Sequence, residues 1–133
     1  MDLHLRGQRI LITGASKGIG AAAAEAFAEE GCHLHLAARN ADALDALAQR
    51  LRKAHGVEIS THAVDLRQSD QLARLADEAA NIDVLVNNAG DIPGGSLDKV
   101  DEQTWRHAWD LKVFGYINLT RLVYAKMKQR GHG

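Results

Sequence analysis

Short, almost wholly apolar runs recur along the chain, and the longer segments between them carry apolar residues at the spacing of one helix face. The apolar runs predict strands at Arg9–Thr13, His33–Ala38, Val57–Val64 and Ile82–Asn87. The longer segments predict helices at Ala21–Gly31, Asn40–Gly56 and Ser69–Ala80, and a fourth from the capping residue Asp101 to Met127. Strands and helices therefore alternate along the chain.

This alternation is typical of an α/β fold, in which a doubly wound parallel sheet carries helices on both faces. Strands that are apolar almost throughout fit burial on both sides. The strand at 82–87 would lie at a sheet edge with unpaired backbone groups, where doubly wound sheets place further strands. We therefore expect residues 1–133 to form a single domain that is apparently incomplete, the first four strands of a longer fold.

The segment TGASKGIG, Thr13–Gly20, joins the first strand to the first helix. Glycines in such a turn let backbone N–H groups approach a pyrophosphate, whose charge the helix N-terminus favours. Gly14 would permit the turn, Gly18 the close approach, and Gly20 the packing of helix on strand. With Ser16, Lys17 and Ile19, these glycines are the predicted phosphate-binding residues of a Rossmann-type, NAD(P)-binding domain.

The end of the second strand predicts which nicotinamide cofactor binds. An acid there would hold the ribose hydroxyls of NAD, whereas an arginine would hold the 2′-phosphate of NADP. The sequence is LAARN: no acid is present, and Arg39 follows the strand. Lys17 adds a second positive charge inside the loop. The sequence therefore predicts NADP as the cofactor, with NAD less favoured.

Composition narrows the class of protein further. The chain has 133 residues, 46% of them hydrophobic, and a formal net charge of −1, so it carries no electrostatic signature of nucleic-acid or membrane binding. Its only cysteine, Cys32, excludes an intrachain disulfide and suits a reducing compartment. No segment approaches transmembrane length. We expect a cytoplasmic protein.

Three motifs together resemble the short-chain dehydrogenase/reductase family. They are TGASKGIG, of the form TGxxxGxG, then Asp65-Leu66 after the third strand, and NNAG, Asn87–Gly90, after the fourth. The resemblance implies an oxidoreductase that moves a hydride between NADP(H) and a small carbonyl or alcohol substrate, and that forms a homo-oligomer. It gives Asp65 and Leu66 contacts to the adenine. It places Asn87, Ala89 and Gly90 near the adenine-side ribose.

The same resemblance bears on catalysis. The family usually carries a catalytic asparagine in the helix after NNAG, and the matching stretch here, WDLKVFGYINLTR, has Asp110 at that place. The family's catalytic serine and YxxxK pair follow a fifth strand that this sequence does not contain. Tyr124 and Lys128 match YxxxK in spelling, but an ordinary helix turn explains them better. The alternative function is a catalytically incompetent nucleotide-binding or oligomer-forming fragment.

Two further pairs have simpler explanations. His33 and His35 share a strand face, as metal ligands do, but no third ligand has fitting spacing, so we predict no metal. Trp105 and Trp109, four residues apart, are interpreted as a packing stripe, with a subunit interface as the alternative.

Overall fold

The computed structural model describes residues 1–133 and contains one four-stranded parallel sheet. The strand order is β3-β2-β1-β4. The strands are β1 (Arg9–Thr13), β2 (His33–Ala38), β3 (Ile59–Ala63) and β4 (Val84–Val86). The sheet confirms the predicted α/β, Rossmann-type architecture.

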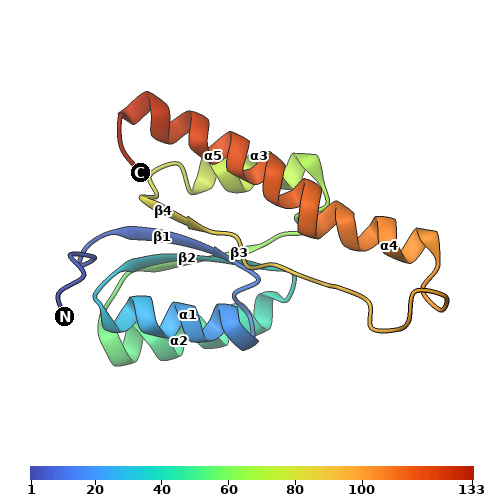
Figure 1. Ribbon diagram of the computed structural model, residues 1–133. Coiled ribbons are helices and arrows are strands. Elements are labelled where there is room, and N and C mark those ends of the chain that lie inside the picture. Colours follow the sequence, from blue (N-terminus) through green and yellow to red (C-terminus); the bar gives the residue numbers. More distant parts are fainter.

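Helices cover both faces of the sheet (Figure 1). They are α1 (Gly18–Glu29), α2 (Ala41–His55), α3 (Ser69–Glu78), α4 (Glu102–Trp109) and α5 (Tyr116–Arg130), with a π-helical segment, η1 (Asp110–Gly115), between the last two. The helices α1 and α2 lie on one face, and α3 and α5 lie on the other. The result is a three-layer domain.

The central strand β1 divides the core into two clusters, because its side chains alternate between the faces of the sheet. Ile10 and Ile12 belong to the cluster with α1 and α2, whereas Leu11 belongs to the cluster with α3 and α5. All three side chains are completely buried. Strand β1 pairs with β2 from Arg9 opposite His33 to Thr13 opposite Ala37, so both strands end at the same level.

Capping residues mark both ends of α2. The Asn40 side chain accepts a hydrogen bond from the Ala43 N–H at the start of α2, and Gly56 ends that helix with a left-handed φ of 67°. Among the helix starts, that of α1 differs most from the one predicted from the sequence: α1 begins at Gly18, three residues before the predicted start. Strands β3 and β4 are also shorter than predicted.

The predicted helix from Asp101 to Met127 is in fact interrupted by η1. The interruption lies where the helix approaches the end of β3: a Cβ added to Gly115 would lie 3.1 Å from the Leu66 carbonyl oxygen. A packing stripe through the two tryptophans is not what the structure shows, because Trp109 is 54% exposed. The buried stripe instead runs through smaller side chains: Ala108, Leu111, Gly115, Leu119 and Val123.

Strand β4 lies at one edge of the sheet and pairs only with β1. Val84, Leu85 and Val86 are half-buried, in contrast to the buried residues of β1. None of the helices combines the length and the apolar composition that crossing a membrane requires. The expectation that residues 1–133 are part of a longer fold stays a prediction.

Candidate cofactor site

A cavity of about 790 Å³ opens at the carboxyl ends of the strands. Five segments line it: the β1–α1 loop, the end of β2 with the start of α2, the end of β3, the loop after β4, and η1 through Leu111. Parallel sheets bind ligands at such a position. Of the predicted cofactor residues, those that line the cavity are Gly14, Ser16, Lys17, Gly18, Ile19, Arg39, Asp65, Leu66, Ala89 and Gly90.

The glycine loop, Thr13–Gly20, is open on the side of the cavity at Gly18 and tightly packed against the protein at Gly20. Gly18 has a φ of +57°, and a Cβ added there would meet nothing within 4 Å. Gly20 does not line the cavity; a Cβ added to it would lie 2.2 Å from the Gly14 carbonyl oxygen. Its place therefore agrees with a packing function rather than with direct contact.

The start of α1 supplies free backbone donors. The N–H groups of the first helical turn have no partner within a helix, and Lys17 at the N-cap position makes no side-chain cap. No acidic side chain occupies this turn. These donors, the open space at Gly18 and the positive charge of Lys17 fit the phosphates of a dinucleotide.

Thr13 and Asn88 hold the loop after β4 against the glycine loop. The Thr13 hydroxyl accepts hydrogen bonds from the Asn88 and Ala89 N–H groups, at 3.0 and 3.1 Å. The Asn88 amide donates to the carbonyls of Thr13 and Gly14, at 3.1 and 3.2 Å. Neither side chain was predicted from the sequence to have this function, although Asn88 is the second residue of NNAG.

Asn87 has a different orientation from its neighbours in NNAG. Its amide donates to the Thr120 hydroxyl of α5 at 2.9 Å, and it does not line the cavity. Its side-chain oxygen is buried without a hydrogen-bond partner. The structure therefore associates Asn87 with α5, and its predicted contact near the ribose stays a prediction.

Asp110 lies outside the cavity lining. It is exposed and lines a separate polar hollow with Glu102, Gln103, Arg106 and His107. The catalytic function expected of it stays a prediction.

Lys112, which sequence analysis did not select, lies beside the NNAG loop instead. Its ammonium donates to the Tyr116 hydroxyl at 3.0 Å, and that hydroxyl donates to the Ala89 carbonyl at 2.6 Å. A Cβ added to Gly90 would lie 3.7 Å from the Lys112 nitrogen. No local pattern in the sequence marks Lys112, because its contact with the NNAG loop depends on how η1 packs in the folded chain.

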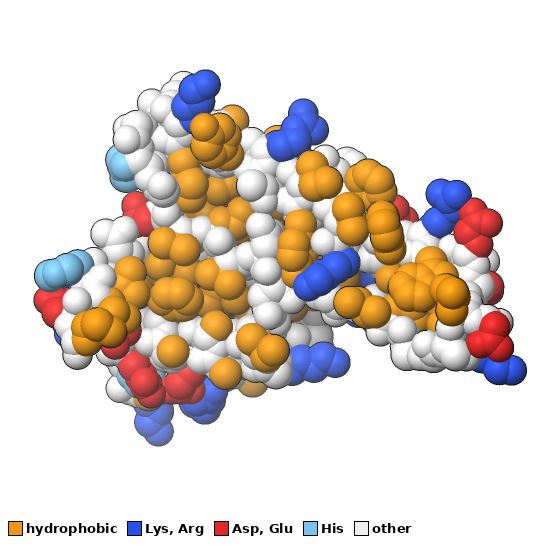
Figure 2. All heavy atoms as spheres, in the orientation of Figure 1, with side chains coloured by type: hydrophobic (Ala, Val, Ile, Leu, Met, Phe, Trp, Pro, Cys, Tyr) orange, Lys and Arg blue, Asp and Glu red, His pale blue; other side chains and the backbone are white.

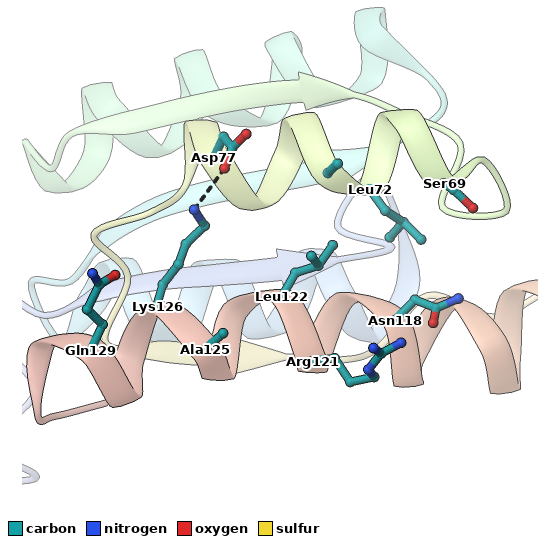
Figure 3. Close-up of a pocket in the computed structure, with 10 residues that line it drawn as sticks. Ser69, Leu72, Asp77, Asn118, Arg121, Leu122, Ala125, Lys126 and Gln129 are labelled. Atoms are coloured by element: carbon teal, nitrogen blue, oxygen red, sulfur yellow. Dashed lines mark hydrogen bonds and ion pairs between the residues drawn. The ribbon is translucent and has the colours of Figure 1, made fainter.

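A hollow between α3 and α5 is separate from the cofactor cavity (Figure 3). Leu72 and Leu122 line it, and Lys126 reaches across to Asp77 at 2.8 Å. Tyr124 and Lys128 are exposed on α5, and neither lines this hollow or the cofactor cavity.

His33 and His35, which share a strand face, have different partners. His35 stacks on His62 of β3, with Nδ1 2.9 Å from His62 Nε2, while His33 Nδ1 accepts from the Glu58 N–H. Burial, followed by the charges of His62 and Arg9, lowers the pKa of His35 to about 4.

One group of side chains elsewhere has metal-ligand chemistry. Ligand atoms of Glu25, Glu29 and His55 lie within 4.8 Å of one another. The Glu25 carboxylate, however, already pairs with His55 and Arg50. This arrangement is explained as an ion-pair network between α1 and α2.

Comparison with known proteins identifies the family. The family model described as short chain dehydrogenase matches residues 8–133, almost the whole chain. The chain belongs to the short-chain dehydrogenase/reductase family. It is 33% identical over 138 residues to the 7alpha-hydroxysteroid dehydrogenase of Escherichia coli K12, covering 99% of this chain and 52% of that protein.

Other relatives show the same partial coverage. The chain is 31% identical over 130 residues to a 3-dehydrosphinganine reductase of Arabidopsis thaliana, covering 98% of this chain and 39% of that protein. It thus spans about half or less of the length of these curated relatives. The family supports oxidoreductase chemistry in general, without identifying a substrate.

Solved structures of this family superpose closely on the chain. The L-sorbose reductase of Gluconobacter frateurii, complexed with NADPH and L-sorbose, gives a TM-score of 0.92 at 34% identity, covering 98% of this chain and 51% of that one. A short-chain dehydrogenase of Sphingobium yanoikuyae in complex with NADPH gives 0.87 at 36% identity, covering 95% and 51%.

Proposed function

We propose that the cavity is the NADP(H) site of a short-chain oxidoreductase that transfers hydride between the nicotinamide and a small carbonyl or alcohol substrate. The observation that carries the proposal is charge: Arg39 and Lys17 both line the cavity, and no acid ends β2. The NADPH complexes of two similar structures support it.

Each part of the cavity has a task in this proposal. When bound, the cofactor supplies the hydride chemistry. The first turn of α1 binds the pyrophosphate, and Arg39 and Lys17 bind the 2′-phosphate. Asp65 and Leu66 position the adenine at the end of β3. Ala89 and Gly90 hold the sugar side, supported by the Thr13–Asn88 hydrogen bonds.

The first prediction tests the selectivity that Arg39 provides. A hydrogen bond to a charged group contributes about 1.5–3 kcal/mol, and about 1.4 kcal/mol is tenfold in affinity. The change Arg39→Asp should therefore weaken NADPH binding about tenfold or more and spare or improve NADH binding, measured by fluorescence titration. Arg74→Asp, on the exposed side of α3, is a matched control. Unchanged relative affinities would contradict the assignment.

A second candidate is a nucleotide-binding or oligomer-forming module without catalysis of its own. Neither Asp110 nor the pair Tyr124 and Lys128 lines the cofactor cavity, which favours it. Exposed apolar side chains, including Phe114 and Ile117, offer a surface for a further subunit or segment (Figure 2). NADPH oxidation with a panel of carbonyl compounds separates the two: NADPH binding without turnover favours the module.

A further inference from the structure

Two arginines at the cofactor cavity share one carboxylate oxygen. Asp91, directly after NNAG, places Oδ2 3.1 Å from Arg67 Nη2 and 3.9 Å from Arg39 Nη2. Arg39 and Arg67 both line the cavity, from the ends of β2 and β3. The residue proposed to receive the 2′-phosphate therefore already has an anionic neighbour in this chain.

Arg67 fixes the position of Asp91. Its side chain is only 5% exposed, and it also donates to the His107 carbonyl at 3.2 Å and lies 3.6 Å from Asp65. A guanidinium held by three partners has little freedom, so its hydrogen bond to Asp91 sets where that carboxylate lies. Arg39, by contrast, is 63% exposed and free to move between partners.

These contacts set up a competition at Arg39. A 2′-phosphate that binds Arg39 must separate it from Asp91 or share it with that carboxylate, and two neighbouring anions repel each other. A ligand without the 2′-phosphate leaves the Arg39–Asp91 pair in place. The Asp91 charge therefore opposes the 2′-phosphate specifically.

We propose that Asp91, positioned by Arg67, is a specificity-determining residue that limits the preference of this site for 2′-phosphorylated cofactors. The inference rests on the proposed NADP(H) function and adds a residue with the opposite effect to Arg39. Because the Arg39–Asp91 pair is exposed, its removal should change selectivity by about two- to fivefold rather than by orders of magnitude.

The experiment compares adenosine 2′,5′-bisphosphate with adenosine 5′-monophosphate, which differ only in the 2′-phosphate. Calorimetric titration of the full chain at low ionic strength gives both affinities for the wild type and for Asp91→Asn. Asparagine keeps an oxygen that accepts from Arg67 and loses the charge. We expect affinity for the bisphosphate to rise about two- to fivefold in the variant, with affinity for the monophosphate unchanged.

Asp77→Asn is the matched control, because Asp77 also pairs with a cation, Lys126, but lies in the hollow between α3 and α5. It should change neither affinity. If Asp91→Asn does not fold, as judged by circular dichroism, Asp91→Ser removes the same charge and takes its place.

The outcomes separate this inference from the proposed function. A wild type that binds both nucleotides equally contradicts the NADP assignment itself. A wild type that prefers the bisphosphate, with a selectivity ratio that neither Asp91 variant raises, overturns the proposal for Asp91 alone. Equal weakening of both nucleotides in the variants also overturns it, because it indicates a structural function for Asp91.

Discussion

At the scale of single residues, the buried side chain of His35 on β2 forms a hydrogen bond with His62 of the neighbouring strand β3. Glu78 accepts from His62 Nδ1 at 2.9 Å, which leaves His62 Nε2 to accept from His35 Nδ1 in turn. Both rings are 8% exposed. These hydrogen bonds engage both ring nitrogens of His62 and Nδ1 of His35, and protonation of His35 would place a charge against His62 and Arg9.

This arrangement predicts acid-sensitive stability. The pKa of His35 falls from 6.5 to about 4 on folding, so between these pH values the unfolded chain binds more protons than the folded chain. The contribution of His35 is therefore present above pH 6.5 and decreases as the pH falls toward 4, by on the order of 2 kcal/mol. Urea unfolding of the wild type and His35→Asn at a series of pH values measures it.

The variant should be less stable at pH 7 and should lose part of the dependence on pH in that window. His4→Asn serves as the control, because His4 lies at the exposed start of the chain. If wild type and His35→Asn show parallel pH profiles, His35 does not cause the acid sensitivity.

At the scale of elements, Tyr116 connects α5 to the loop after β4. Its hydroxyl donates to the Ala89 carbonyl at 2.6 Å and accepts from Lys112, whose ammonium also lies 4.8 Å from the centre of the tyrosine ring. This link holds a cavity-lining residue from a helix that does not itself line the cavity.

Removing the hydroxyl should loosen the link. We expect Tyr116→Phe to lower the free energy of unfolding by about 1 kcal/mol, because the Ala89 carbonyl loses its side-chain donor, and to weaken nucleotide binding. Urea unfolding and nucleotide titration measure the two effects. Tyr124→Phe, at an exposed tyrosine on the same helix, should change neither quantity. If Tyr116→Phe and Tyr124→Phe change stability and nucleotide affinity equally, the hydrogen bond from Tyr116 to Ala89 does not contribute to either.

The helices and strands could be predicted from the sequence better than the side-chain contacts between them. The glycine loop and the strands could be predicted because local patterns determine them. The Thr13–Asn88 hydrogen bonds, 75 residues apart, could not be, since nothing local pairs those side chains. The predicted stripe at Trp105 and Trp109 was wrong because the buried face of α4 runs through Ala108, and Trp109 lies about 100° around the helix axis from that residue.

At the scale of the whole molecule, the cavity is lined by five segments that are distant in the sequence. A ligand that contacts several of these segments at once binds only the folded chain and stabilises it. We therefore predict that NADPH at about 100 times its dissociation constant raises the midpoint of thermal unfolding by about 5–10 °C. NADH at the same concentration should give a smaller rise. Equal shifts for the two cofactors would argue against selectivity for the 2′-phosphate.

The π-helical segment η1 joins α4 directly to α5. Each residue advances an α-helix by about 100°, so the wider turn of η1 sets α5 out of phase with α4. Trp109 is turned outward within α4 itself, because it lies about 100° around the helix axis from the buried Ala108, whereas Leu119 and Val123 of α5 are buried. In Figure 1, α4, η1 and α5 form one continuous run of helix. The six residues of η1 therefore determine how the buried face of α5 is rotated about the helix axis relative to α4.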